Sequence, residues 1–328
     1  MELRLDPATR ETLADRRERL RSIQASGPAS PEIADLLSRV DAALGRWEAG
    51  RYGLCEICGD PVEEDRLRAD PLIRYCVDDM DAAERAALER DLGTAARVQR
   101  ALLPPQDVGA AGWDVRWEWR PHGAVSGDYC DLVPSRSGAG DFLFAVGDVA
   151  GKGVAASILS SHLNALFRTL HDLQLPVGDM LFRANRVFCE STGESHYATL
   201  AVGRAAPDGA VEWCNAGQTP PLLVSEAGVE ACRGSGLPLG LFCDVPYLPV
   251  SRRLRPGESL VLATDGVTEA PDQAGDEFGS ERLGRAAFLA RAGSAREIAR
   301  ACLGALDAHR GGVPAHDDVT LLVLKRAG

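Results

Sequence analysis

The sequence predicts an α+β protein in which a helical N-terminal region precedes a larger domain of mixed strands and helices. Up to Leu103, apolar residues recur at the spacing of amphipathic helices, whereas strand-like segments begin at Trp113. The length of 328 residues is enough for about two domains. Apolar residues make up 45% of the chain and charged residues 26%, the usual mix for a globular protein with a buried core.

The charge and the hydropathy pattern argue against several classes of partner. A net charge of -12 disfavours nucleic acid and anionic membranes, because both require basic patches. The most apolar segment, residues 142–167, is interrupted by Asp148 and Lys152, so no transmembrane helix is expected. The N-terminus, Met1–Asp6, lacks the apolar stretch of a secretory signal. We therefore expect a cytoplasmic protein with no membrane or nucleic-acid partner.

Residues 1–50 are predicted to form a helical hairpin. Leu13, Leu20 and Ile23 share one helical face before a cluster of helix-breaking residues at 27–31. The residues that follow keep a 3.6-residue apolar stripe: Ile33, Leu36, Leu37, Val40, Leu44 and Trp47. Two amphipathic helices joined by a short turn pack as a hairpin, and each is expected to have fewer than 20 residues.

Residues 51–80 are expected to form a compact module whose cysteine spacing suits zinc. Cys55 and Cys58 can occupy adjacent corners of a metal tetrahedron, and Cys76 can take a third. The fourth corner falls to Asp79, although structural zinc sites prefer Cys and His. Two interpretations stay open: a zinc site, which we favour, and a degenerate knuckle that keeps its fold without metal.

The other six cysteines follow no spacing pattern. In the absence of a secretory signal, they are expected to be buried structural thiols and not a disulfide framework. They are Cys130, Cys189, Cys214, Cys232, Cys243 and Cys302.

A third helix is predicted from Asp79 to Leu102, where Pro104–Pro105 ends it, so residues 81–112 form a helical linker. The remainder, residues 113–328, forms one mixed domain. Its strands are expected at residues 113–119, 142–146, 197–202, 210–214, 260–263 and 319–324. Its helices are expected at residues 153–170, 281–290 and 294–309.

Aspartates stand at the ends of apolar strands in this domain, each beside a small residue. They are Asp128 with Asp131, Asp148, Asp265, and Asp317 with Asp318. Carboxylates that converge at the ends of packed strands repel one another unless cations lie between them. Hard divalent cations such as Mg²⁺ and Mn²⁺ prefer oxygen ligands, and this half of the chain has no His/Cys set that would favour zinc.

The cysteine module resembles the TraR/DksA-type zinc finger. The resemblance covers about residues 31–80 and is carried by Arg51–Val62, Arg66–Leu67 and Tyr75–Cys76. That family includes proteins that enter the secondary channel of RNA polymerase by means of acidic residues at a coiled-coil tip. Here the tip, residues 26–30, has no acidic residue and the helices are short, so the resemblance implies a structural or interaction role and not polymerase binding.

The larger domain resembles the metal-dependent protein phosphatases (PPM family), and within them the SpoIIE/RsbU-like branch. The segments that carry the resemblance occur in the family's order between residues 94 and 326. They are Val98–Pro104, Ser126–Asp131, Gly147–Gly153, Asn215–Gly217, Pro238–Gly240, Thr264–Ala270 and Asp317–Thr320. The resemblance implies a two-sheet β-sandwich flanked by helices, with a dinuclear Mn²⁺ or Mg²⁺ site at one edge.

The same resemblance implies roles for the aspartates. Asp148 would bridge both metal ions, and the carbonyl of Val149 would complete the shell of one. The catalytic set would be Asp128, Asp148, Asp265 and Asp317. Asp131, and Asp318 in an outer position, complete the candidate metal residues.

The activity implied is hydrolysis of phosphoserine or phosphothreonine on a regulatory protein by a metal-activated water molecule. The resemblance suggests a phosphorylated anti-sigma-factor antagonist as substrate, and hence control of transcription by partner switching. Linker helices of the family often pair as coiled coils, so residues 81–103 are expected to support a homodimer. Two alternatives stay open: a catalytically silent scaffold, and a regulator that binds RNA polymerase through the finger.

Overall fold

The structure of the protein, a computed structural model, describes residues 7–26, 31–79, 82–105, 111–135, 140–192, 196–232, 234 and 236–328. The chain divides into two compact units, one that ends at Asp91 and one that begins at Leu92. Of the expected hairpin tip at residues 26–30, residues 27–30 lie outside the described residues. The finer division at residues 50, 80 and 112 stays a prediction.

The first unit contains a helical hairpin and the cysteine module. α1 (Pro7–Ser26) packs against α2 (Pro31–Glu48), and one apolar cluster includes Leu13 from α1 and Val40 from α2. The same cluster extends into the cysteine module, which carries the short helix α3 (Glu64–Ala69). α1 has 20 residues, so the expectation of fewer than 20 is wrong for this helix.

The second unit begins within α4 (Ala82–Leu102), and its described residues build two antiparallel sheets of five strands each. One sheet has the order β1-β10-β9-β6-β7 and the other β2-β3-β4-β5-β8. The strands are β1 (Trp113–Arg120), β2 (Asp128–Pro134), β3 (Phe142–Val149), β4 (Ala198–Ala205), β5 (Ala210–Ala216), β6 (Leu222–Ser225), β7 (Gly228–Ala231), β8 (Val250–Arg253), β9 (Ser259–Ala263) and β10 (Val319–Arg326).

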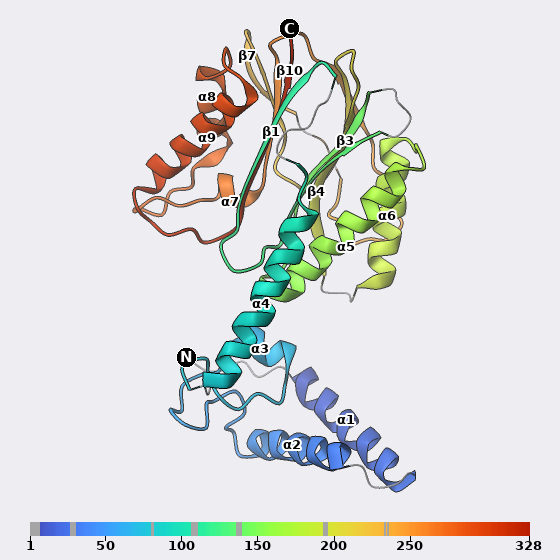
Figure 1. Ribbon diagram of the computed structural model, residues 1–328, viewed down its shortest axis with the longest axis vertical. Helices are drawn as coiled ribbons and strands as arrows, with labels where there is room; N and C mark the ends of the chain where they lie inside the picture. The colour runs from blue at the N-terminus through green and yellow to red at the C-terminus, as the bar shows by residue number, and fades with distance from the viewer. Residues whose placement is uncertain are drawn as a thin grey trace. The chain divides into compact units, whose positions relative to one another are not determined.

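Pairs of helices cover the outer faces of the two sheets, so the second unit has four layers (Figure 1). α5 (Gly153–His171) and α6 (Val177–Ser191) pack on the sheet that contains β2. α8 (Gly279–Leu289) and α9 (Ala295–Arg310) pack on the sheet that contains β1. The expected sandwich of two sheets flanked by helices is therefore confirmed. None of the helices in the described ranges is long and apolar enough to cross a membrane.

The central apolar cluster lies between the two sheets and includes Trp213 and Phe144, both fully buried. Alternation along a strand sends neighbouring side chains to opposite faces. In β3, Phe144 and Val146 face the other sheet, whereas Leu143 and Ala145 face α5 and α6. This alternation decides which of the acids can meet, because only residues an even number of positions apart share a face.

Several elements were not predicted from the sequence, among them the short strands β6, β7 and β8, the strand β2 and the helix α6. β2 was not recognised because Asp128 and Asp131 interrupt an otherwise apolar run, yet both acids are buried in the strand. α6 was also missed, although its buried residues keep helical spacing: Val177, Met180, Leu181, Ala184 and Phe188. The single-turn helix α7 (Asp265–Thr268) follows β9 directly.

α9 has clear sequence signals at both ends. The hydroxyl of Ser294 accepts a hydrogen bond from the N–H of Glu297, and the Glu297 carboxylate accepts one from the N–H of Ser294, which is a capping box. Gly311 ends the helix in the left-handed conformation, with φ at 54°. These caps fix the position of Arg310, the last residue of α9.

A disulfide bond joins Cys189 of α6 to Cys243 on an exposed loop, so the expectation of free thiols is wrong for this pair. The amide of Asn185, one turn earlier on α6, donates to the carbonyl oxygen of Phe242 (2.7 Å) and accepts from the N–H of Gly240 (2.9 Å). The pairing could not be read from spacing because 54 positions separate the two cysteines. The other four are buried free thiols, as expected: Cys130, Cys214, Cys232 and Cys302.

The disulfide should contribute measurably to stability, because it closes a loop over a sequence separation of 54 residues. Loop-closure entropy in the unfolded chain then gives a stabilisation of about 2–4 kcal/mol. We expect the double variant Cys189→Ser/Cys243→Ser to lose that amount in denaturant unfolding under non-reducing conditions. A reductant should lower wild-type stability to that of the variant and leave the variant unchanged. Equal stability of the oxidised wild-type protein and the variant would contradict the prediction.

Candidate active site

The predicted acids come from both sheets of the second unit. Asp128 of β2 and Asp148 of β3 are directly opposite each other in the antiparallel ladder, so their side chains share a face. In the other sheet, Asp265 follows β9, Asp317 precedes β10, and these two strands are neighbours. Packing of the sheets therefore brings together four acids from distant parts of the chain.

Two threonines hold the carboxylate of Asp128 from the opposite sheet. The hydroxyls of Thr264 (3.0 Å) and Thr320 both donate to Oδ2 of Asp128. The two threonines are themselves joined, because the N–H of Thr320 donates to the Thr264 hydroxyl at 3.1 Å. Burial raises the pKa of Asp128 well above its usual value, and the nearby charge of Asp148 raises it further. The carboxylate is thus fixed in place where positive charge would stabilise it.

A small space lies between Gly127 and the end of β3. Oδ1 of Asp148 and the carbonyl oxygen of Val149 both lie 3.0 Å from the point that a Cβ atom on Gly127 would occupy. Glycine therefore leaves open a space toward which two oxygen atoms converge, as a hard divalent cation requires. This geometry fits the pairing of Asp148 with the Val149 carbonyl that the family resemblance implies.

The carboxylate of Asp318 binds backbone groups. Its Oδ1 accepts from the N–H of His122 (2.6 Å) and its Oδ2 from the N–H of Gly127 (2.9 Å). The backbone of Asp318 also passes close to Gly266. Only glycine fits at position 266, since a Cβ atom there would overlap the carbonyl oxygen of Asp318. Asp318 therefore holds the loop that carries Gly127, and both of its oxygens are used within the protein.

Burial and neighbouring negative charge raise the pKa of two further acids. Burial raises the pKa of Asp148 to about 8, and the charges of Asp265 and Asp317 contribute to the shift. Burial likewise raises the pKa of Asp265, with Asp317 again contributing. The ammonium of Lys152 offsets part of this charge, because it lies 3.3 Å from the Asp317 carboxylate. The same ammonium donates to the carbonyl oxygen of His316 at 2.9 Å.

The donor set fits divalent cations. It consists of oxygen atoms, which Mg²⁺ and Mn²⁺ prefer as ligands. The acids outnumber the nearby cationic side chains, so bound cations would balance their charge. Among the described residues, these acids do not cluster as tightly as the ligand atoms of the Cys55 group described below, which all lie within 4.8 Å of one another. A site for two ions would need a wider ring of ligands than a site for one, because two-metal sites in proteins generally hold their ions about 3.5–4 Å apart.

Asp131 lies apart from the other acids. It follows Asp128 by three positions on β2, so its side chain faces α5 on the opposite side of the sheet. Its two oxygens accept hydrogen bonds from the guanidinium of Arg168 at 2.8 and 2.9 Å, and Asn164 donates to Oδ2 at 3.0 Å. Asp131 is completely buried in this ion pair. The structure does not bring it to the predicted metal site.

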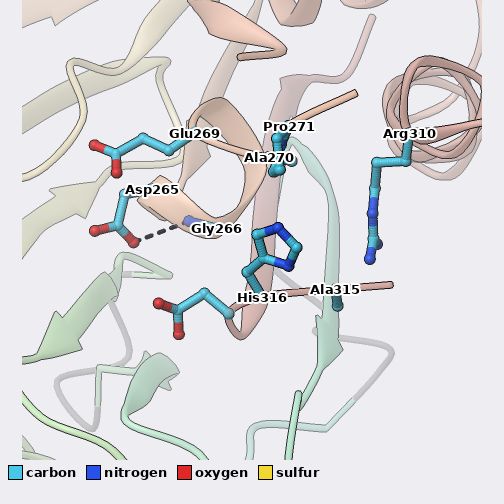
Figure 2. A pocket seen from close by; sticks show the side chains of 9 residues that line it. Asp265, Gly266, Glu269, Ala270, Pro271, Arg310, Ala315 and His316 are labelled. Atoms are coloured by element: carbon cyan, nitrogen blue, oxygen red, sulfur yellow. Dashed lines mark hydrogen bonds between the residues drawn. The ribbon is translucent and has the colours of Figure 1, made fainter. Parts of the chain in front are cut away.

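A pocket of about 220 Å³ adjoins the acids. Figure 2 shows Asp265 and Glu269 on one side of it and Arg310 on the opposite side, with His316 between them. Burial raises the pKa of Glu269, and the charge of Asp265 raises it further. Carboxyl groups therefore line the side of the pocket nearest the acids, and the guanidinium of Arg310 lines the far side.

Sequence reasoning missed the residues that position the site. These residues are Thr264, Thr320 and Gln99 of α4. The amide of Gln99 donates to the carbonyl oxygen of Ser126 (2.6 Å) and accepts from the N–H of the same residue (3.0 Å). All three lie within segments that carry the family resemblance, but hydrogen bonds between distant segments leave no spacing signal in the sequence.

The cysteine module holds a second candidate metal site. The ligand atoms of Cys55, Cys58, Cys76 and Asp79 all lie within 4.8 Å of one another, as the spacing predicted. Sγ of Cys58 and Sγ of Cys76 are 3.7 Å apart. Oδ2 of Asp79 accepts from Cys55 Sγ at 3.1 Å and from Cys76 Sγ at 3.3 Å. Hydrogen bonds from Cys58, Cys55 and Cys76 hold the pKa of Asp79 below its usual value.

These distances fit a tetrahedral zinc ion. Thiolates at about 2.3 Å from zinc stand about 3.8 Å apart at the tetrahedral angle, and a thiolate and a carboxylate oxygen about 3.5 Å apart. The separations among Cys58, Cys76 and Asp79 are close to these values. The donor set of three sulfurs and one carboxylate oxygen can therefore hold Zn²⁺ with little rearrangement.

The chain belongs to the family described as Stage II sporulation protein E (SpoIIE), whose family model matches residues 138–327. A second family model, described as prokaryotic dksA/traR C4-type zinc finger, matches residues 50–78. Both resemblances inferred from the sequence are thereby confirmed. In this chain the residue directly after the matched finger is Asp79, which stands where a fourth cysteine ligand is expected.

Two curated relatives match about three quarters of this chain. Protein IcfG of Synechocystis sp. is 24% identical over 277 residues, which cover 75% of this chain and 42% of IcfG. Phosphoserine phosphatase RsbU of Bacillus subtilis is 26% identical over 242 residues, which cover 73% of this chain and 71% of RsbU. Thus the chain matches less than half the length of IcfG but most of RsbU.

A solved structure has the same fold. The RsbU and RsbW domains of Rv1364c from Mycobacterium tuberculosis align with a TM-score of 0.58 and 27% identity, over 68% of this chain and 62% of that one. The second unit is thus a domain of the SpoIIE/RsbU type, which includes serine phosphatases.

The raised pKa of Asp148 predicts how the stability of the metal-free protein depends on pH. The folded-state pKa of about 8 lies above the unfolded value of about 3.9, so the folded state binds the proton more tightly. Stability from this group is therefore present below pH 4 and is lost as the pH rises toward 8. In chelator, we expect Asp148→Asn to be more stable than wild type by about 2 kcal/mol or more at pH 8, with the gain absent at pH 4.

The measurement is denaturant unfolding in chelator across this pH range. Added Mn²⁺ should reverse the order at pH 8, because it stabilises wild type more than Asp148→Asn. An equal response of both proteins to Mn²⁺ would argue against Asp148 as a ligand.

Proposed function

We propose that the protein is a metal-dependent protein phosphatase that hydrolyses phosphoserine or phosphothreonine on a regulatory protein. The observation that carries this proposal is the convergence of Asp128, Asp148, Asp265 and Asp317 from two sheets, with raised pKa values for the first three. Membership of the SpoIIE family and similarity to phosphoserine phosphatase RsbU support it.

The proposed metal ligands are the oxygen donors at the ends of the strands. They are Asp128, Asp148, the carbonyl of Val149, Asp265 and Asp317. Two Mn²⁺ or Mg²⁺ ions, when bound, would activate water for attack on phosphorus and neutralise phosphoryl charge. Asp131 is left out of this set because its carboxylate is occupied by Arg168.

The chain's own residues position this chemistry. Thr264 and Thr320 keep the Asp128 carboxylate in one orientation, and Asp318 fixes the loop of Gly127. In the reaction, a bond forms between phosphorus and the water oxygen while the ester P–O bond breaks. The electron pair of that bond stays on the seryl oxygen, which takes up a proton, and the attacking water loses one. No protein nucleophile is needed, which agrees with cysteines in this unit that are buried or disulfide-bonded.

The proposed substrate is a phosphorylated anti-sigma-factor antagonist, which would place the protein in partner-switching control of transcription in the cytoplasm. This proposal rests on the resemblance to the SpoIIE/RsbU-like branch.

We further propose a homodimer formed through residues 81–103. In support of it, Val98 of α4 is 56% exposed, which leaves an apolar side chain on this helix available for contact.

Two alternatives remain testable. A catalytically silent scaffold would bind a partner through the same surface but would take up no Mn²⁺, so calorimetric metal titration separates it from an enzyme. A regulator that binds RNA polymerase is favoured only by the DksA-like finger. Co-purification with RNA polymerase that is lost in Cys55→Ser would support this alternative.

The proposed function is tested by phosphate release from a phosphoserine protein in the presence of Mn²⁺. We expect Asp148→Asn and Asp265→Asn to lower kcat by about 100-fold or more, because each removes a ligand charge from the ions that stabilise the transition state. Asp244→Asn, which changes an exposed acid outside the site, is the matched control and should keep wild-type activity. Full activity of Asp148→Asn and Asp265→Asn would refute the metal assignment.

The finger is proposed to bind zinc through three thiolates and the Asp79 carboxylate. We expect about one zinc ion per chain by elemental analysis, because three thiolates and a carboxylate complete a tetrahedral site. Cys55→Ser and Asp79→Ala should lose most of this zinc. Asp60→Ala, at an exposed acid of the same module, should retain it. A folded module without zinc would establish the alternative of a metal-free knuckle.

A further inference from the structure

The pocket beside the acids has a cationic side chain at its far side. Arg310, partly buried at the end of α9, lines this pocket together with Asp265 and Asp317. Figure 2 shows the side chain of Arg310 extending from its helix toward Ala315, across the pocket from Asp265. The pocket therefore connects the region proposed for phosphoryl binding to a guanidinium.

Arg310 has no carboxylate partner among the residues that the structure describes. By contrast, Arg120 pairs with Asp307, one turn earlier on α9, at 3.0 Å. A partly buried guanidinium prefers an anionic partner and can bind a carboxylate through two parallel hydrogen bonds. The lack of such a partner in the described part of the chain leaves Arg310 available to a ligand.

A role in helix stability does not account for the position of Arg310. A basic residue in the last turn of a helix contributes about 0.3–1 kcal/mol through the helix macrodipole. His309 already supplies a basic residue in this turn, and its Nε2 lies 2.9 Å from the carbonyl oxygen of Asp276. The macrodipole also does not require the side chain to face a pocket.

The size of the pocket indicates what it can hold. At about 220 Å³ it is smaller than the roughly 300–1,000 Å³ of pockets for small organic ligands. It can accept one amino-acid side chain of a bound protein. Because successive residues of an extended peptide advance about 3.3–3.6 Å, a residue within about three positions of the phosphorylated one can reach it.

We infer that Arg310 is a specificity-determining residue that binds the carboxylate of a Glu or Asp close to the phosphoserine of the substrate. This inference rests on the proposed phosphatase function. The phosphoryl group occupies the cation site among the aspartates, and the acidic side chain crosses the pocket to the guanidinium. The substrate class is therefore a phosphoserine protein with an acidic residue next to the phosphorylation site.

The test uses pairs of phosphoserine peptides that differ by a single Glu or Gln at each position within three residues of the phosphoserine. Phosphate release by the full chain with Mn²⁺ is measured for each. For wild type, we expect kcat/KM to be about tenfold higher for the Glu peptide at one position, mainly through a lower KM, because a charge-assisted hydrogen bond is gained. In Arg310→Ala this ratio should fall to within about twofold.

Further variants separate specificity from folding. Arg310→Lys should retain part of the preference, and Arg310→Glu should favour a Lys peptide at the same position. Arg300→Ala, at an exposed residue of α9, is the matched control and should keep the wild-type ratio. Thermal unfolding of each variant reports any loss of stability.

The outcomes distinguish this inference from the function on which it rests. If wild type hydrolyses the peptides without preferring Glu at any position, or if Arg310→Ala keeps the preference, the role of Arg310 is overturned and the phosphatase function stands. If wild type with Mn²⁺ hydrolyses neither the peptides nor p-nitrophenyl phosphate, the proposed function itself is contradicted.

Discussion

Desolvation of the carboxylates at the strand ends, together with their mutual repulsion, is the constraint on which the second unit depends. The pKa of Asp148, at about 8, corresponds to a penalty of about 5 kcal/mol when the group is ionised without compensating charge. Burial of apolar side chains between the sheets, such as Trp213 and Phe144, opposes this penalty, at about 1.5–3 kcal/mol for each large side chain. The sandwich therefore stores an unfavourable interaction that bound cations would relieve.

The layout of the strands explains why the site needs both sheets. Asp128 and Asp148 face each other within one sheet, whereas Asp265 and Asp317 belong to strand ends of the other. The hydrogen bonds from Thr264 and Thr320 to Asp128 cross between them. A shift of one sheet relative to the other would break these bonds and separate the acids, so the geometry of the site follows directly from the inter-sheet core.

Local patterns in the sequence were sufficient to predict much of the fold. Apolar periodicity predicted the N-terminal hairpin and most strands, and the spacing of Cys55, Cys58, Cys76 and Asp79 predicted a cluster that the structure forms. What could not be predicted depends on partners far away in the chain. The bond between Cys189 and Cys243 is one such case, and the contacts that Gln99 makes with Ser126 are another.

Asp131 illustrates how a motif can combine acids with different purposes. It stands three positions from Asp128 in a segment shared with phosphatases, but the twofold alternation of β2 turns it toward α5, where Arg168 neutralises it. Removal of Arg168 would leave the buried charge of Asp131 unpaired, at a cost of about 3–5 kcal/mol. A neutral residue at position 131 would remove the hydrogen bonds from Arg168 and Asn164 that tie α5 to its sheet. A screen that scored activity alone would mistake the resulting loss for that of a metal ligand.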